Sequence, residues 1–282
     1  MKPFVYRWLL PLGAAIVCAI VLWIFVGNHV YRISGRAMFP FAYDGDWVYA
    51  EKPVDIQCGD ILLIGNPLDY RHSSPRISYS RCIATPGSKV QIYSKRLYVN
   101  DELQQGVNIS FDAEVLLLNE ADKRAAVDRY KLVPENQILT NTKYVVSQNL
   151  FNRMVSDSVL SHVRQSVLPA YLYDDKLFPF SHQFNFNKDY FGPVVVPSKG
   201  MKIKLTPSNY LVYKFLFLHA EKTKVEHRDG VFYVDGIKSD SYTFKHDYFF
   251  MLNDYRDDPS DSRTYGPVAD DEIVARVSSV IF

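Results

Sequence analysis

The sequence Ser34-Gly35-Arg36-Ala37-Met38-Phe39-Pro40 follows an apolar N-terminal run and is itself followed, after three further residues and Asp44, by Gly45-Asp46. The chain changes character at this point. Before it lies a long apolar segment, and after it apolar and polar residues alternate over short stretches, as they do in half-buried strands. The glycines and the proline are typical of turns. Residues 34–46 therefore join an N-terminal segment to a β-rich body.

A second motif follows an expected strand at residues 77–83. It begins at Ser80-Arg81 and ends in Ala84-Thr85-Pro86-Gly87-Ser88-Lys89-Val90. Pro-Gly is a strong turn signal, and residues 89–102 are expected to form a hairpin. Further strands are expected at residues 30–33, 46–51 and 61–64.

The third motif lies near the C-terminus. Residues 248–263, called here the C-terminal box, read Tyr-Phe-Phe-Met-Leu-Asn-Asp-Tyr-Arg-Asp-Asp-Pro-Ser-Asp-Ser-Arg. An apolar strand runs into a turn that is dense in carboxylates and guanidiniums. Arg256 and Arg263 are expected to pair with Asp254, Asp257 and Asp261, because guanidinium and carboxylate groups form strong charge-assisted hydrogen bonds.

Together the three motifs resemble the conserved boxes of the signal peptidase I (leader peptidase) family, whose members cut signal peptides with a serine–lysine dyad. The family pattern Gly-x-Ser-Met-x-Pro…Gly-Asp is similar to Gly35, Met38, Phe39 and Pro40 with the later Gly45-Asp46. Residues 34–46 are therefore called here the nucleophile box. Residues 80–90, called here the base box, resemble Lys-Arg-x-x-Gly-x-Pro-Gly-Asp-x-Val, and the C-terminal box resembles Phe-x-Met-Gly-Asp-Asn-Arg-Asp-Asn-Ser-x-Asp-Ser-Arg. Matches there include Asp254, Arg256, Asp257, Asp261, Ser262 and Arg263, whereas Asn253 replaces the glycine and Tyr255 the first asparagine of that pattern.

Both dyad positions differ from the family. Ala37 stands in the serine position, and Ser80, immediately before Arg81, stands in the lysine position. A methyl group has no lone pair with which to attack a carbonyl. The resemblance implies a buried lysine with a lowered pKa as general base, and a serine hydroxyl has no comparable basicity. It also implies that Ser262 orients that lysine and that the neighbouring aspartates and arginines brace the site.

Other residues could in principle replace the dyad. Ser34 or Ser80 could act as a nucleophile, with Lys89, Lys52 or Lys95 as base. Such a pair needs hydrogen-bond geometry, which the sequence alone does not establish. The alternative of an active peptidase with displaced residues therefore stays open beside the expectation that hydrolysis is lost.

Residues 8–27 contain no charged side chain, and about 20 apolar residues are needed to cross the hydrocarbon core of a bilayer as a helix. We expect a retained transmembrane anchor; a cleaved secretory signal is the alternative. The resemblance implies a single-pass protein of the inner (cytoplasmic) membrane with its main domain on the periplasmic, exported side. A net charge of +1 gives no reason to expect a nucleic-acid partner.

The expected fold class is mostly β, a signal-peptidase-like domain with an α+β insertion and one N-terminal transmembrane helix. Its expected divisions are 1–29 for the cytoplasmic tip and anchor, 30–104 with 222–282 for the β domain, and 105–221 for the insertion. The insertion resembles those of Bacteroidetes-type members. Within it we expect helices at 113–132, 134–136, 157–167 and 207–220, an extended stretch at 144–146, and an aromatic linker at 178–193.

The chain has three cysteines. Cys58 and Cys82 could form a disulfide in an oxidising compartment, or they could remain two buried thiols. Neither the cysteines nor the seven histidines show metal-ligand spacing, so no metal site and no cofactor are predicted.

Three functional hypotheses follow. The first is an inactive signal-peptidase homologue that binds exported preproteins, signal peptides or an active signal peptidase at the membrane. The second is an active type I signal peptidase that uses displaced residues. The third is a structural role in a membrane assembly with a vestigial groove.

Overall fold

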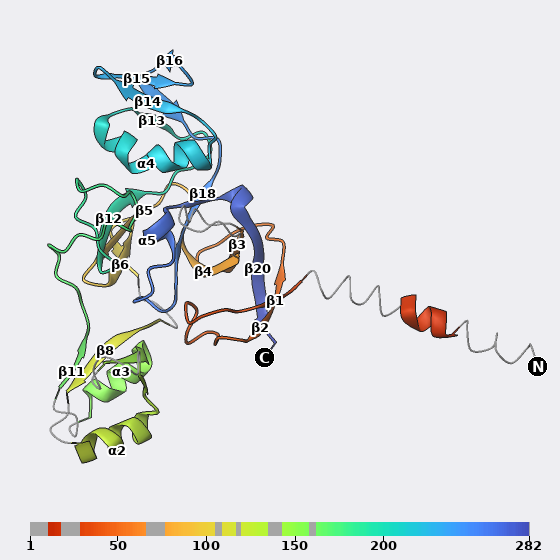
Figure 1. Ribbon diagram of the computed structural model, residues 1–282, viewed down its shortest axis with the longest axis vertical. Helices are drawn as coiled ribbons and strands as arrows, with labels where there is room; N and C mark the ends of the chain where they lie inside the picture. Colours follow the sequence, from red (N-terminus) through yellow and green to blue (C-terminus); the bar gives the residue numbers. More distant parts are fainter. Residues whose placement is uncertain are drawn as a thin grey trace, which may run out of the picture.

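A computed structural model describes residues 11–17, 29–65, 77–104, 109–116, 120–134, 143–157 and 162–281 (Figure 1). Residues 11–17 are helical. Within the described ranges, no helix combines the length and the apolar character needed to cross a membrane. Most of the anchor predicted at residues 8–27 lies outside the described residues.

A seven-stranded sheet forms the centre of the molecule, in the order β1-β2-β20-β3-β4-β18-β19. Every neighbouring pair in it is antiparallel. Its strands are β1 Val30–Arg32, β2 Trp47–Glu51, β3 Ile61–Gly65, β4 Ile77–Ala84, β18 Tyr248–Leu252, β19 Val268–Ala269 and β20 Ile273–Val280. The strands predicted around residues 30–33, 46–51, 61–64 and 77–83 are thereby confirmed. The nucleophile box follows β1, the base box lies on β4, and the C-terminal box starts on β18.

Apolar residues cover both faces of this sheet, as the alternation along β3 illustrates. Ile61 and Leu63 pack on one face with Met38, while Leu62 and Ile64 pack on the other with Met251. Successive side chains of a strand point to opposite faces, so a continuous apolar run fits a strand that is buried on both sides. The two cores hold the three boxes in fixed positions.

A second sheet, in the order β12-β5-β6-β7, contains the hairpin predicted after the base box. Its strands are β5 Lys89–Tyr93, β6 Arg96–Val99, β7 Glu102–Leu103 and β12 Tyr190–Val195. Because β12 pairs with β5, the expected linker at 178–193 is wrong at its C-terminal end. Phe178 and Phe191 of this stretch are buried, which shows that its aromatic residues belong to a core.

The helix predicted at residues 207–220 is confirmed as α4 Pro207–His219, with Thr206 as its N-cap. It lies beside the ribbon of β14 Val225–Arg228, β15 Val231–Val234 and β16 Ile237–Lys238 at one end of the molecule (Figure 1). A two-stranded sheet of β13 Lys202–Lys204 and β17 Ser241–Thr243 completes this region. Its apolar residues share one core with β5, β12 and β18.

The opposite end of the molecule holds a third sheet, β11-β8-β10-β9, with two helices (Figure 1). Its elements are β8 Ser110–Leu116, α2 Glu120–Tyr130, β9 Val133–Pro134, β10 Lys143–Ser147, α3 Gln148–Val155 and β11 His162–Gln165. The extended stretch at 144–146 is confirmed. Residues 109–165 thus have their own core, whereas residues 186–220 pack with β5 and β18.

Three helix predictions in this end of the chain are wrong in whole or in part. Residues 113–116 belong to β8, because Phe111, Ala113 and Val115 alternate into the core, and the helix starts only at Glu120. Residues 133–134 form a strand, and 135–136 lie outside the described residues. Residues 162–165 form β11 beside β8 instead of a helix.

Candidate functional site

The nucleophile box is a compact turn that brings Ala37 to the C-terminal box. Gly35 has φ +83°, a conformation that glycine adopts easily, and its N–H donates to Asp44 Oδ1 at 2.8 Å. Met38 is fully buried in the core below. The carbonyl of Ala37 accepts from the backbone N–H of Tyr255 at 2.9 Å. The side chain in the nucleophile position is therefore a half-buried methyl group, on a residue that a backbone hydrogen bond holds beside Tyr255.

Ser80 lies on β4 and is completely buried. Its hydroxyl donates to Asn253 Oδ1 at 2.7 Å. The Asn253 amide also donates from Nδ2 to the carbonyl of Asp258 and to Ser260 Oγ, both at 3.2 Å. Ser80 and Asn253 thus form a neutral, hydrogen-bonded pair. In the family pattern, a lysine stands at the position of Ser80 and a glycine at the position of Asn253.

Tyr265 is a further neighbour of Ser80, and sequence reasoning gave it no role. Burial raises the pKa of the Tyr265 phenol, although the nearby hydroxyls of Ser80 and Ser78 act in the opposite direction. A phenol with a raised pKa stays neutral at neutral pH and cannot accept a proton. Among the described residues, no lysine or histidine is hydrogen-bonded to Ser80, so no neighbouring group is suited to activate it as a nucleophile.

Arg81 is anchored by a two-point ion pair with Asp254. Its Nε and Nη2 donate to the two Asp254 carboxylate oxygens at 2.7 and 2.6 Å, and Nη1 donates to the carbonyl of Gly59. The guanidinium carbon also lies 5.7 Å from the centre of the Phe41 ring. Burial raises the pKa of Asp254, and the Arg81 guanidinium opposes that shift. This pair fixes the base box against the C-terminal box.

Asp261 and Arg263 brace the C-terminal box from within. Arg263 Nε and Nη2 donate to the two Asp261 oxygens at 2.9 and 2.7 Å, and both residues are almost completely buried. Asp261 also caps the short helix α5 Ser262–Tyr265. The Ser262 hydroxyl accepts from the backbone N–H of Met251 at 2.9 Å, so its oxygen supports the end of β18.

The remaining charges of the box pair differently from the expectation. Asp257 is bound by Lys95 and Lys188, each with Nζ 2.5 Å from Oδ1. Burial alone would raise the pKa of Asp257, but the two ammonium groups lower it below its usual value. Within the described part of the chain, the Arg256 guanidinium forms no hydrogen bond or ion pair with any aspartate. The expectation that Arg256 pairs with these carboxylates is therefore wrong.

Two of the lysines considered as a replacement base are already engaged. Lys95 is buried and also lies 3.0 Å from Asp189, and Lys89 forms an ion pair with Asp101 at 2.6 Å. Ser34 is exposed on the surface. None of these three is seen to contact Ser80 in the part of the chain that is described.

The comparison with known families agrees with this geometry. Residues 5–156 and 217–282 match the family model described as signal peptidase, peptidase S26. The chain belongs to the signal peptidase family. All three boxes lie inside the matched residues, and the stretch between residues 156 and 217 lies outside them.

Two curated signal peptidases are similar to it. Signal peptidase I of Bacillus amyloliquefaciens is 25% identical over 167 residues, covering 47% of this chain and 82% of that protein. Signal peptidase I T of Bacillus subtilis (strain 168) is 30% identical over 95 residues, covering 31% of this chain and 47% of that protein. The similarity supports the signal peptidase family assignment. Whether this member hydrolyses peptides has to be argued from its own residues.

Cys58 and Cys82 of this signal peptidase homologue are free thiols that lie close together. Cys82 is buried on β4, and Cys58 is exposed in the turn before β3. The Cys82 thiol donates to the carbonyl of Ala84 at 3.8 Å. Interaction with the Cys82 thiol and a hydrogen bond from the backbone N–H of Thr85 outweigh burial and lower the pKa of Cys58 to about 6. Of the two thiols, only Cys82 is buried, so the alternative of two buried thiols is wrong for Cys58.

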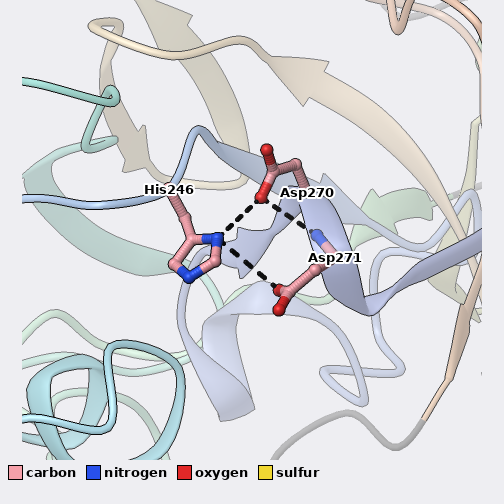
Figure 2. Close-up of side chains that lie close together, drawn as sticks. All are labelled: His246, Asp270 and Asp271. Carbon is pink, nitrogen blue, oxygen red and sulfur yellow. Dashed lines mark hydrogen bonds and ion pairs between the residues drawn. The ribbon is translucent and has the colours of Figure 1, made fainter.

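One cluster of possible metal ligands was not found from the sequence. His246, Asp270 and Asp271 converge at the end of β19, with their ligand atoms within 4.8 Å of one another (Figure 2). His246 Nδ1 lies 3.0 Å from Asp270 Oδ1 and 3.9 Å from Asp271 Oδ1. Both aspartates are exposed and also suit a simple surface ion pair with a protonated histidine. The spacing of 24 residues explains why no sequence motif indicated the cluster.

Proposed function

We propose that this member of the signal peptidase family binds exported preproteins or an active signal peptidase and does not itself hydrolyse peptides. The observation that carries the proposal is the hydrogen bond from Ser80 to Asn253, because it fills the general-base position with a neutral pair. The nucleophile position holds the methyl group of Ala37.

The chemistry of acyl transfer supports this proposal. A serine nucleophile needs a base that takes its proton, and the neighbours of Ser80 are an amide and a phenol of raised pKa. In a serine hydrolase, loss of the nucleophile or of its base alone lowers kcat by about a million-fold. Replacement of both groups therefore favours loss of hydrolysis over slow hydrolysis.

Binding does not require either dyad side chain. Signal peptidases are expected, from the resemblance, to hold their substrate as an extended strand beside the site. Strand addition depends on main-chain hydrogen bonds and on pockets for alternate side chains. β1 is an outer strand of the central sheet and leads directly into the nucleophile box, which is compatible with an added strand at this edge.

The proposal includes a single membrane anchor in residues 8–27 and a main domain on the exported side of the inner membrane. This placement would bring the three boxes to the surface from which signal sequences emerge. A purely structural role in a membrane assembly remains the alternative if no peptide or peptidase partner is bound.

The first test is hydrolysis by the purified full-length chain. We expect no cleavage of a preprotein whose signal sequence ends in small-x-small, under conditions in which an active signal peptidase cleaves it completely. Cleavage that disappears on Ser80→Ala or Ser34→Ala would overturn the proposal in favour of an active peptidase with displaced residues.

The second test asks whether the frame still holds catalytic geometry. We expect the double variant Ala37→Ser/Ser80→Lys to stay inactive and the triple variant with Asn253→Gly to gain cleavage, because Asn253 occupies the contact made by residue 80. Photo-crosslinking in native membranes tests the binding role. Recovery of neither a preprotein nor a peptidase would refute it.

A further inference from the structure

A cavity of about 440 Å³ lies where the second sheet, the C-terminal box and the sheet of residues 109–165 meet. Its volume is in the lower part of the range of about 300–1,000 Å³ that is typical of small-molecule sites. Leu97, Ile109 and Leu252 give it apolar walls, and the side chains of Gln104, Gln148 and Gln165 supply amide groups. The cavity therefore offers both an apolar surface and partners for peptide groups.

The positive charges around this cavity are mostly neutralised by the protein itself. Lys95 and Lys188 pair with Asp257, and Arg263 pairs with Asp261. Arg96, which also lines the cavity, is exposed to solvent. These partners leave one partly buried cation of the lining to be explained.

That cation is Arg256. Its Nη1 atom is buried and has no hydrogen-bond partner, and across the described ranges its guanidinium takes part in no ion pair. Burial and the neighbouring Arg263 lower the pKa of Arg256 to about 10, against the opposing attraction of Asp254 and Asp261, so the group is still charged at neutral pH. A buried N–H group without a hydrogen-bonded partner is costly, and an anion that accepts from it would remove much of that cost.

We propose that this cavity binds a carboxylate attached to an apolar group, such as the C-terminal carboxylate of a peptide that ends in an apolar residue. The single positive charge of Arg256 balances the charge of a monoanion, whereas the two negative charges of a dianionic phosphate would exceed it. The planar guanidinium matches the two oxygens of a carboxylate. The apolar walls would hold the last side chain, and the glutamine amides would bind peptide groups.

This site is separate from the Ser80–Asn253 pair in its lining residues, so the inference does not depend on whether the protein hydrolyses peptides. A peptide C-terminus and a free fatty acid present the same chemistry. The experiment must therefore distinguish these two sources as well as the charge.

The test is isothermal titration calorimetry of the full-length protein in a non-ionic detergent. Four probes are compared: N-acetyl-Leu-Leu, its C-terminal amide, octanoate and inorganic phosphate. We expect the acid to bind at least about 10-fold more tightly than the amide, since a hydrogen bond to a charged group is lost in the amide. Octanoate would bind more weakly than the peptide if the glutamine amides contribute.

Two variants locate the effect. Arg256→Gln should abolish the preference for the acid over the amide, whereas Arg96→Gln, which removes the exposed cation of the same cavity, should change the affinity less than 3-fold. If Arg256→Gln does not fold, the comparison of acid and amide on the unmodified protein still decides the question. Equal affinity for acid and amide, tighter binding of phosphate, no binding, or an acid preference that survives in folded Arg256→Gln overturns the proposal.

Discussion

The hydrogen bond between Ser80 and Asn253 makes a quantitative prediction, because both partners are buried and the bond joins two neutral side chains. Replacement of Ser80 by alanine leaves Asn253 Oδ1 without this donor. An unsatisfied buried acceptor costs about 1–3 kcal/mol, so Ser80→Ala should lower the free energy of unfolding by that amount. Asn253→Ala should cost more, since it also removes the bonds to Asp258 and Ser260.

The double variant isolates the bond itself. Once Asn253 is alanine, Ser80→Ala removes only a hydroxyl that has already lost its acceptor, so its effect should be smaller. We expect the two substitutions to couple by about 1 kcal/mol, the net value of a typical hydrogen bond. Ser147→Ala with Asn253→Ala is a matched control: Ser147 caps α3 in a different sheet, and this pair should be additive within about 0.5 kcal/mol.

The measurement is urea unfolding of the full-length protein in a non-ionic detergent, with near-UV circular dichroism as the signal and equal m-values as the condition for comparison. A coupling below about 0.3 kcal/mol would refute the bond as a stabilising pair. Stabilisation by Ser80→Ala would contradict the reasoning more deeply. Residues kept for activity often reduce stability, and such a gain would point to Ser80 as a functional group.

Three further predictions rest on other contacts. Gly266→Ala should lower the unfolding free energy by more than about 1 kcal/mol in the same urea assay, because Gly266 has φ +84° and an added Cβ would lie 2.6 Å from the Phe178 ring; an unchanged midpoint would contradict this. The alkylation rate of Cys58 by iodoacetamide should rise with pH through a midpoint near 6, because the thiolate is favoured above its lowered pKa, and Cys82→Ala should move that midpoint toward the ordinary value of 9.0. A midpoint near 9 in the unmodified protein would contradict the interaction between the two thiols. Glu221→Ala should destabilise the protein by about 2 kcal/mol or more, because two buried tyrosine hydroxyls donate to this carboxylate; a loss below about 0.5 kcal/mol would show that these bonds contribute little.

The central sheet could be predicted because its strands carry local signals. Ile61–Ile64 is a short apolar run bounded by Gly-Asp and Gly-Asn-Pro, and such a run between turn signals is typical of a buried strand. The hairpin after Lys89 and the helix capped by Thr206 carry equally local signals. Each of these elements was found at nearly its observed bounds.

The insertion was predicted less well, because its local patterns fit more than one structure. Val115, Leu118, Ala121 and Ala125 recur at roughly helical spacing in the sequence, but the pairing of β8 with β10 and β11 on its two sides makes residues 113–116 a strand. The helix α3 was missed although Ser147 caps it and Leu150 and Met154 lie one turn apart on it. Tertiary pairing of this kind is not encoded in a short window.

The ion pairs of the site show the same limit for charged residues. The sequence contains enough aspartates and cations to form several equivalent sets of pairs. The observed set depends on Lys95 and Lys188, which lie far from the C-terminal box in the sequence and reach Asp257 through the fold. Arg256 therefore feels the charges of Asp254 and Asp261, but its buried Nη1 atom has no hydrogen-bond partner.

Asn253 stands where the family pattern has a glycine. This difference would change the hydrogen bonding and the pKa of a lysine introduced at position 80. An ammonium group there would have the Asn253 amide oxygen, now bound by Ser80, as a hydrogen-bond acceptor. A hydrogen bond accepted from the charged form stabilises that form and raises the pKa of an amine. Such a lysine would stay protonated at neutral pH and could not accept a serine proton. Two positions of the chain, Ser80 and Asn253, therefore account for the loss of the base. Recovery of activity requires removal of the Asn253 amide as well as a lysine amine at position 80.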